Sequence, residues 1–275
     1  MIIALWEFLK PLLPKILRLA VRSVYRWYMR SYCRYVGLWD RREIKKRGLE
    51  HLPSASLRYR VHGSPHIDGF LDVGKRCARD VQRALNIAEY ELENCGKILD
   101  FGCGCGRTML WLQDLTAGSQ LYGTDIDGEA IGWCESHLPQ GTFGVNGHEP
   151  PLAYPDEYFD LILGITVFTQ IGEDNHRRWI QELGRIVRPD GIILVTIRGE
   201  TCWRTLEAEE IEQLEKEGSL FRVTGYMKGI YPEWYQAAYH TKEYIQREYG
   251  KCFDILEYLE AELDNSQDIV LLRKK

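Results

Sequence analysis

Five residues near the middle of the chain, Gly102-Cys103-Gly104-Cys105-Gly106, have the composition of a turn that binds a nucleotide-like ligand. The apolar run 97–101 leads into this turn and predicts a strand, and a helical stretch follows it. Glycine admits positive φ and lets the backbone approach a ligand closely. The G-x-G-x-G spacing lacks the third glycine position of the fingerprint that suits a pyrophosphate. Alone, the turn indicates a nucleotide-like ligand, and a purely structural tight turn is the alternative.

A carboxylate follows the turn at the separation that a nucleoside site requires. Asp125 comes nineteen residues after Gly106, at the end of the apolar run 120–124. In βαβ nucleotide sites a carboxylate at this place accepts hydrogen bonds from the ribose hydroxyls. Asp127 is a weaker candidate, because it can instead cap the helix that starts near Gly128. The turn and Asp125 together predict nucleoside binding, and a surface role at the end of a strand is the alternative for Asp125.

The elements around these residues predict an α/β fold with a doubly wound, mostly parallel sheet. Apolar runs alternate with helical stretches, which is typical of a parallel sheet with helices on both faces. The last two apolar runs are too close for a crossover helix, so they predict an antiparallel hairpin at the sheet edge. The expected strands are 97–101, 120–124, 142–145, 159–164, 191–197, 253–259 and 268–273, and the expected helices are 68–92, 106–115, 128–137 and 174–187.

Four segments resemble motifs of the class I, Rossmann-like S-adenosylmethionine-dependent methyltransferases. "ILDFGCGCGRTMLWL" and "LYGTDIDGEAI" are similar to the first and second motifs of that family. "PPLAYPDEYFDLILG" looks like the segment that leads into its fourth strand, and "LGRIVRPDGIILVT" like the helix, turn and strand that follow. The resemblance covers about residues 95–200, and "NSQDIVLLRKK" suits the last strand. It implies S-adenosylmethionine as cofactor and methyl transfer as activity.

The resemblance also implies roles for residues around the glycine turn. Asp100 would organise the turn and face the amino group of the methionine moiety. Gly102, Gly104 and Gly106 would surround the amino-acid end of the cofactor. Asp125 would hold the ribose, and Ile126 would pack against the adenine ring.

Two later segments would complete the cofactor site. In the loop after the third strand, an acidic residue of the family often meets the adenine amine. This chain has Asn146, Gly147 and His148 at that place. Ile165 and Thr166, at the end of the fourth strand, would flank the methionine and the transferable methyl group.

Two histidines are candidates for a catalytic base. A sulfonium methyl is already electrophilic, so the protein mainly excludes water and aligns the nucleophile. Nitrogen, carbon or oxygen acceptors can also need a base near the methyl group. His176 follows the fourth strand, and His240 lies in an insertion at about 199–240. The alternatives are a solvated His176 on a helix surface and a His240 that hydrogen-bonds its own turn.

Aromatic and basic residues on two flanking segments are candidates for binding the acceptor. Loops over the carboxyl ends of strands are where substrate is recognised. The insertion supplies Tyr231, Trp234 and Tyr235, and the upstream segment supplies Arg58 and Tyr59. Arg58, like the neighbouring Arg60, could pair with the methionine carboxylate or an anionic substrate. A surface salt bridge to the acidic body is the alternative.

The N-terminal part of the chain differs in charge from the rest. Residues 1–50 carry a formal charge of +8 and the remainder carries −13. Residues 1–36 predict a basic amphipathic helix, and 37–66 predict a loop-rich connector. This extension precedes a methyltransferase domain at 67–275 that contains the insertion at about 199–240. The helix is expected either to pack on the acidic body or a second subunit, or to lie as a peripheral anchor on a membrane surface, and nucleic-acid binding is the remaining alternative.

Composition narrows the partners and the compartment. The net charge of −5 favours no nucleic-acid partner, and the eight cysteines form no metal-ligand pattern, so no metal is expected. No signal peptide is evident, which indicates the cytoplasm, including the inner surface of the membrane. We expect methyl transfer to a small-molecule or a lipid- or glycan-like acceptor. The alternatives are a non-catalytic scaffold that binds S-adenosylmethionine and a nicotinamide-dependent oxidoreductase.

Overall fold

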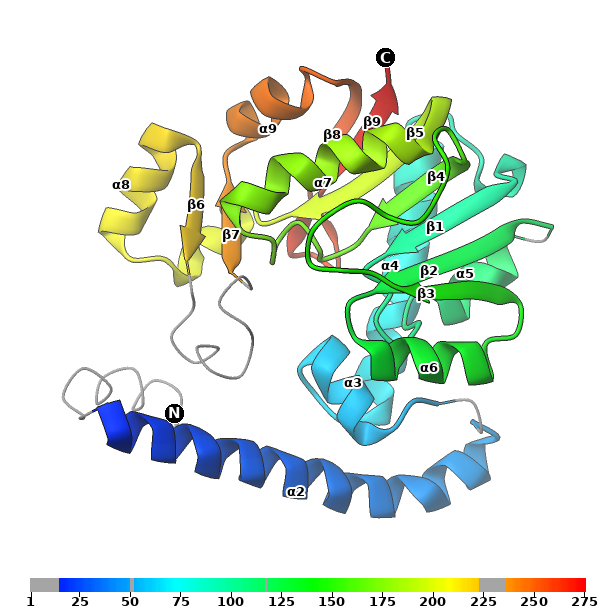
Figure 1. Ribbon diagram of the computed structural model, residues 1–275, viewed down its shortest axis with the longest axis vertical. Helices are drawn as coiled ribbons and strands as arrows, with labels where there is room; N and C mark the ends of the chain where they lie inside the picture. Colours follow the sequence, from blue (N-terminus) through cyan, green and yellow to red (C-terminus); the bar gives the residue numbers. More distant parts are fainter. Residues whose placement is uncertain (1–14, 50–51, 117, 223–235) are drawn as a thin grey trace.

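A seven-stranded sheet forms the centre of the computed structural model, which describes residues 15–49, 52–116, 118–222 and 236–275, without the side chains of 15–22 and 26 (Figure 1). Five neighbouring strands are parallel, and a C-terminal hairpin completes the sheet at one edge. The hairpin strand next to the parallel strands runs antiparallel both to them and to the edge strand. This confirms the expected doubly wound sheet with a C-terminal hairpin. Across the sheet the strands are β3 (Gly141–Val145), β2 (Gln120–Asp125), β1 (Lys97–Phe101), β4 (Phe159–Gly164), β5 (Val187–Ile197), β9 (Gln267–Lys274) and β8 (Phe253–Leu263).

Helices cover both faces of the sheet because successive strand residues point to opposite sides. Ile98 of β1 faces a core that α4 (Ile67–Ile87) and α5 (Met109–Leu115) complete, together with Val81 and Leu85. Leu99 faces the other core, which α7 (Glu173–Ile186) and α9 (Lys242–Tyr249) close. The helix α6 (Gly128–His137) packs beside β2 and β3. The expected helix 68–92 ends five residues early, because Glu89 turns the chain with φ 55°.

The insertion forms a small unit beside the carboxyl ends of β4 and β5. It contains the 3-10 helix η3 (Glu200–Thr205), α8 (Ala208–Glu217) and a two-stranded antiparallel sheet of β6 (Ser219–Arg222) and β7 (Ala237–His240). Two backbone bonds attach β7 to the main domain: Ala238 donates to the Thr169 carbonyl at 3.0 Å, and His240 donates to the Arg198 carbonyl at 3.1 Å. The insertion therefore lies where an acceptor would approach a parallel sheet.

The N-terminal extension is more helical than expected. The helix α2 (Lys15–Arg47) runs eleven residues into the predicted connector and ends just before Gly48, which has φ 65°. The short helix α3 (Ala55–His62) occupies another part of that connector and lies between α2 and the sheet (Figure 1). Within the described residues, no helix is long and apolar enough to cross a membrane.

A buried arginine joins α2 to α3. The Arg58 guanidinium forms an ion pair with Asp40 of α2 and donates to the carbonyls of Pro53 and, at 2.8 Å, Pro65. Arg58 is fully buried, and the carboxylate and carbonyl partners compensate its desolvation. This placement differs from the substrate contact expected for Arg58. Tyr59 likewise packs against the apolar cluster between α2 and α3 that contains Cys33.

Candidate cofactor and active site

The glycine turn connects β1 to α5 and is tied to β2. The amides of Gly102 and Cys103 both donate to the Thr124 carbonyl, at 2.7 and 3.0 Å. Gly102, Gly104 and Gly106 have φ values of 81°, 55° and 72°. Residues with a Cβ rarely adopt this left-handed conformation, so the turn needs glycine at all three positions.

Protein side chains pack closely against the three glycines. A Cβ on Gly102 would lie 2.2 Å from Cγ2 of Val167, in the loop after β4. A Cβ on Gly104 would lie 2.6 Å from Cγ2 of Val61 on α3, and a Cβ on Gly106 would lie 2.6 Å from Cδ1 of Leu138. The glycines therefore permit both the turn and its packing. Val61 and Val167 were not predicted from the sequence, because only the fold brings them to the turn.

Asp125 braces the turn from the end of β2. Its Oδ2 accepts from the Gly104 amide at 2.8 Å and its Oδ1 accepts from the Asp127 amide at 2.8 Å. Burial raises the pKa of Asp125, and these backbone donors act against that increase. A carboxylate oxygen has two lone pairs, so each oxygen keeps acceptor capacity for a ribose hydroxyl.

Two exposed apolar side chains lie beside Asp125. Ile126 is 42% exposed and Val145 is 61% exposed, which is unusual for β-branched residues next to a sheet. Val145 pairs in register with Asp125 at the end of β3. The two side chains suit a flat apolar ring such as adenine. Val145 was not predicted, although an apolar residue ending the strand next to the carboxylate was a usable signal.

The loop after β3 contains a buried acceptor that lacks a partner. The Asn146 amide donates to the Asp125 carbonyl at 3.1 Å, and its Nδ2 donates to the Gly147 carbonyl at 2.7 Å. Its Oδ1 is buried and accepts no hydrogen bond from the described residues. A buried acceptor without a donor costs free energy, so a ligand amine would be favoured there. The His148 carbonyl accepts from Trp179 Nε1 at 3.1 Å, which holds this loop on α7.

Asp100 provides buried negative charge behind the turn. Burial raises the pKa of its carboxyl to about 7, the nearby Asp125 adds to the increase, and Arg107 opposes it. Two carboxylates on adjacent strands repel each other, and a cationic ligand between them would relieve that repulsion. The site is therefore electrostatically suited to a positively charged ligand.

The end of β4 is held in a strained turn. Ile165 is buried, and Thr166 has φ 64°, which is a genuine outlier for a β-branched residue. The Thr166 amide donates to Thr196 Oγ1 at 2.7 Å, and Thr166 Oγ1 accepts from Gln267 Nε2 at 3.4 Å. Thr196 also donates to Gln267 Oε1 at 2.7 Å. Side chains of β5 and β9 thus fix the turn that presses Val167 against Gly102.

The two candidate histidines lie together in the interior, with ring centroids 4.6 Å apart. His176 Nε2 lies 3.3 Å from the Tyr249 hydroxyl, whereas neither ring nitrogen of His240 has a partner among the described residues. Burial lowers the pKa of His176 to about 3, with a smaller contribution from Arg177. Burial also lowers the pKa of His240 well below its ordinary value, and the nearby His176 and Arg198 lower it further. The expectation of a solvated His176 is wrong, because Tyr249 of α9 covers it.

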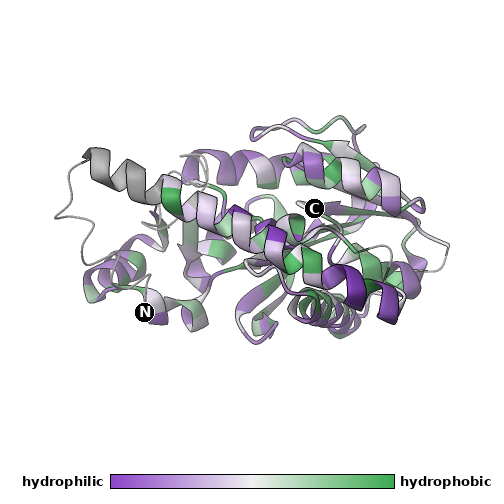
Figure 2. Ribbon diagram, turned by 90° about the horizontal axis from the view of Figure 1, so that it is seen from below, coloured by the Kyte–Doolittle hydropathy of each residue, from purple (hydrophilic) through white to green (hydrophobic). Residues whose placement is uncertain are grey.

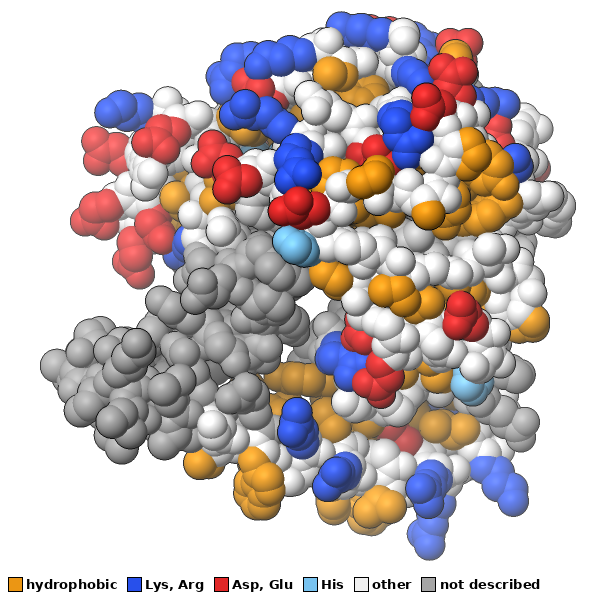
Figure 3. All heavy atoms as spheres, viewed as in Figure 1, with side chains coloured by type: hydrophobic (Ala, Val, Ile, Leu, Met, Phe, Trp, Pro, Cys, Tyr) orange, Lys and Arg blue, Asp and Glu red, His pale blue; other side chains and the backbone are white. Residues whose placement is uncertain are grey.

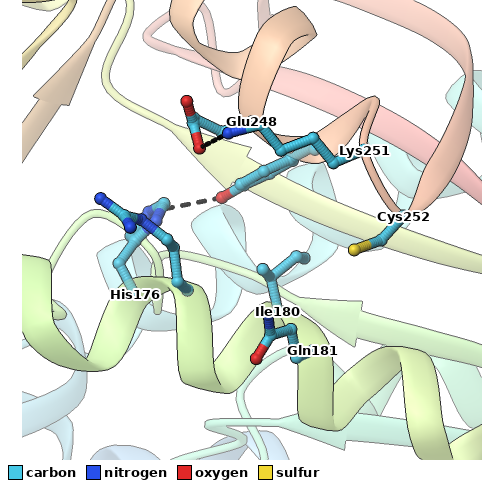
Figure 4. Close-up of a pocket in the computed structure, with 8 residues that line it drawn as sticks. His176, Ile180, Gln181, Glu248, Lys251 and Cys252 are labelled. Carbon is cyan, nitrogen blue, oxygen red and sulfur yellow. Dashed lines mark hydrogen bonds and ion pairs between the residues drawn. The ribbon is translucent and has the colours of Figure 1, made fainter.

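A cavity of about 250 Å³ lies between α7 and the end of α9 (Figure 4). His176 and Gln181 come from α7, and Lys251 and Cys252 come from the turn after α9. No residue of the glycine turn or of the loops after β2 and β3 lines this cavity. His176 therefore borders a space separate from the edge where Asp100 and Asp125 lie.

The histidine pair predicts a stability that falls as the pH drops below neutral. Unfolded histidine titrates near about 6.5, so the unfolded chain binds protons before the folded chain does. Above that pH, protonation of the two histidines does not lower the free energy of unfolding. Below it, each histidine lowers the free energy of unfolding by up to about 1.4 kcal/mol per pH unit. Denaturant unfolding at pH 7.5 and 5.5 should show a smaller loss for His240→Phe than for the wild type. Equal losses would contradict this prediction. The raised pKa of Asp100 changes the stability with pH in the opposite direction, but this effect is present in both proteins and cancels in the comparison.

Arg60 has protein partners near the start of α6. Arg60 forms ion pairs with Asp127 at 2.7 Å and Glu129 at 2.9 Å, which attach α3 to the start of α6. Among the described residues, no group of three or more His, Cys, Asp or Glu side chains could hold a metal ion. Tyr231, Trp234 and Tyr235 lie outside the described residues.

The central part of the chain is similar to known methyltransferases. Residues 99–195 match a family model described as a methyltransferase domain. A tRNA (carboxymethyluridine(34)-5-O)-methyltransferase of Arabidopsis thaliana is 29% identical over 131 residues, covering 44% of this chain and 31% of that protein. A fatty-acid O-methyltransferase of Mycolicibacterium smegmatis is 27% identical over 106 residues, covering 36% of each chain. The chain thus spans about a third of the length of these relatives.

Solved structures share the fold at low sequence identity. A S-adenosylmethionine-dependent methyltransferase of Methanosarcina mazei has a TM-score of 0.53 and 23% identity, over 69% of this chain and 96% of that one. The magnesium protoporphyrin IX methyltransferase of Synechocystis, solved with S-adenosylhomocysteine, has a TM-score of 0.53 and 18% identity. That match covers 79% of this chain and 93% of the other. These similarities establish the Rossmann-like fold.

Proposed function

We propose that this chain is a class I S-adenosylmethionine-dependent methyltransferase and transfers a methyl group to a small-molecule or a lipid- or glycan-like acceptor. The observation that carries the proposal is the arrangement of Asp100 and Asp125 around a glycine turn at the carboxyl ends of adjacent strands. Ligands of open α/β sheets bind at this edge. The proposal covers the activity of the whole protein, its acceptor and its partners.

The residues at this edge fit the adenosyl and methionine groups. Asp125 has acceptor capacity for the ribose, and Ile126 and Val145 offer an exposed apolar surface for adenine. Asn146 Oδ1 is a buried acceptor that an adenine amine would satisfy. Asp100 places negative charge where the cationic amino group would lie. A nicotinamide dinucleotide fits less well, because the turn has the spacing G-x-G-x-G and lacks the third glycine position of the dinucleotide fingerprint G-x-G-x-x-G.

The chemistry of the reaction divides between cofactor and chain. S-adenosylmethionine supplies an electrophilic methyl group on a positively charged sulfur. The carboxylates of Asp100 and Asp125 would bind and orient the donor. The turn at Ile165 and Thr166, which Thr196 and Gln267 hold, would form the wall facing the methyl group. The described part of the insertion would exclude water above β4 and β5, so that an acceptor nucleophile could align with the sulfur–methyl bond.

Two classes of acceptor have specific support. The relative that methylates fatty acids and the basic helix α2 favour an amphiphilic or small-molecule acceptor. The relative that methylates tRNA makes RNA the second candidate, so the net charge of −5 does not exclude a nucleic acid. The lipid- or small-molecule acceptor is preferred here because the surface outside α2 is acidic and would repel phosphates.

Calorimetry and product analysis test the proposed function. The full chain should bind S-adenosylmethionine and should give no heat of binding with nicotinamide dinucleotides. Heat of binding with a nicotinamide dinucleotide would instead indicate an oxidoreductase. Incubation with separate lipid, small-molecule and tRNA fractions should yield S-adenosylhomocysteine with one of the first two. Formation of S-adenosylhomocysteine with the tRNA fraction alone would overturn the proposed class of acceptor. Tight binding without product from any fraction would favour a non-catalytic scaffold.

Binding of S-adenosylmethionine should weaken below neutral pH because Asp100 must be ionised. Burial raises the pKa of Asp100 to about 7 in the free protein, and the cationic ligand lowers it on binding. Binding therefore releases a proton, and affinity should fall up to about tenfold per pH unit below 7. Asp100→Asn should bind more weakly at pH 8 and lose most of this dependence. Calorimetry in two buffers of different ionisation enthalpy measures the number of protons released on binding. Binding below pH 7 without proton release would contradict the prediction.

A further inference from the structure

An exposed row of aromatic and aliphatic side chains follows the outer side of α2. These side chains are 55–70% exposed: Val24 (64%), Trp27 (70%), Tyr28 (55%), Tyr35 (57%), Leu38 (63%) and Trp39 (61%). At 3.6 residues per turn they fall within about 120° of the helix circumference. The buried residues of the same helix, Cys33 and Val36, lie on the opposite side and face Ala55. The apolar row is therefore additional to the face that attaches α2 to the protein.

Cations border this row along the helix. Arg30, Arg34, Arg41, Arg42 and Lys45 are exposed. Asp40, one of two acidic residues in α2, is paired inward with Arg58. Hydrophobic and cationic side chains alternate along the lower edge of the molecule, where α2 runs (Figure 3). The view from below shows the same mixture of hydrophobic and hydrophilic residues along α2 (Figure 2).

We propose that the outer face of α2 docks this protein on an anionic lipid bilayer. Interfacial helices combine Trp, Phe and Leu on one face with Lys and Arg at its flanks. Aromatic rings with a polar edge suit the depth of the headgroups, and the cations attract anionic lipids. This claim is independent of the proposed methyl transfer, because docking is measured without turnover.

The observations favour a bilayer over the other occupants. A second copy of the chain would bring like charges together, since α2 contains eleven Lys and Arg residues against two acidic ones. RNA would pair with the cations, but it would leave the aliphatic groups of Val24 and Leu38 against a polar backbone. A bilayer satisfies both the charge and the apolar row.

Docking would hold the cofactor edge close to the membrane. The Arg58–Asp40 ion pair joins α2 to α3, and Val61 of α3 packs against Gly104. α3 therefore lies between the docking face and the glycine turn (Figure 1). An amphiphilic acceptor could reach the donor without leaving the surface of the bilayer.

Vesicle flotation of the full chain tests the proposal. The probes are vesicles of phosphatidylcholine alone and of phosphatidylcholine with 30% phosphatidylglycerol, in low and high salt. We expect flotation only with the anionic vesicles, and at least a tenfold loss of bound protein in high salt. Absence of flotation with anionic vesicles in low salt would overturn the proposal.

Two pairs of variants separate apolar insertion from charge. Trp27→Gln with Leu38→Gln and Trp39→Gln should reduce binding at least tenfold, whereas Ile87→Gln, at an exposed apolar position on α4, should not. Arg41→Glu with Arg42→Glu should also reduce binding, whereas Arg204→Glu with Lys216→Glu, with the same change in net charge, should not. Circular dichroism confirms that each variant is folded.

Two further outcomes would assign the face to another occupant. A tRNA gel shift that is stronger than vesicle binding and insensitive to the Trp27, Leu38 and Trp39 substitutions would overturn the proposal in favour of RNA. A dimer detected by light scattering and abolished by those three substitutions would overturn it in favour of a second copy. Equal flotation of the triple variant and the wild type would also contradict it.

Discussion

Asp125→Asn should weaken binding of S-adenosylmethionine about a hundredfold, because hydrogen bonds to a charged group contribute about 1.5–3 kcal/mol each. The substitution also replaces one acceptor oxygen with a donor. Asp125 accepts from two backbone amides, those of Gly104 and Asp127, so an amide nitrogen would face one of these donors. The ribose contact and the brace of the glycine turn are lost together.

Asp127→Asn is the matched control for this change. It removes the same charge two residues away, and asparagine caps a helix as well as aspartate does, so the bonds to the Glu129 and Ala130 amides can persist. It also weakens the ion pair with Arg60, which is partly exposed and contributes little. Isothermal titration at pH 8 should show near wild-type affinity for Asp127→Asn. Similar losses in both variants would assign the effect to net charge instead of the position of Asp125.

Gly102→Ala should lower the free energy of unfolding by about 3 kcal/mol and abolish measurable cofactor binding. The left-handed conformation costs an L-residue about 1–2 kcal/mol, and overpacking adds about 1–3 kcal/mol. The overpacking arises because the new Cβ would lie 2.2 Å from Val167 Cγ2. Val167 belongs to the loop that Thr166 fixes, so the displacement would reach the expected methyl-transfer edge.

Two further variants separate strain from overpacking. Gly118 has φ 97° and no atom within 4 Å of its potential Cβ, so Gly118→Ala reports the conformational cost alone. In the double variant Gly102→Ala with Val167→Ala, part of the lost stability should return. Urea unfolding measures all three. Equal costs at Gly102 and Gly118, with no recovery in the double variant, would show that the contact with Val167 is unimportant.

The positions of the strands and the cofactor motifs were predictable because they depend on local signals. Glycines at 102, 104 and 106 and the carboxylate at 125 occur at fixed separations in one βαβ unit, and apolar runs identified the strands. Element ends were less predictable. The strand expected at 191–197 begins at Val187, and α2 continues through Leu38 and Trp39 to Arg47. In these places tertiary contacts extend an element beyond its local pattern.

The sequence by itself determined the type of donor site, because a tight turn and a strand-end carboxylate have the same geometry in any sheet of this kind. Only the tertiary structure decided which distant side chains complete it. Val61, Val145 and Val167 come to the site from three separate elements. Burial likewise lowers the pKa values of His176 and His240, because side chains from distant parts of the chain pack around both rings. Spacing along a chain records local geometry, whereas burial and charge depend on what the rest of the chain places around a residue.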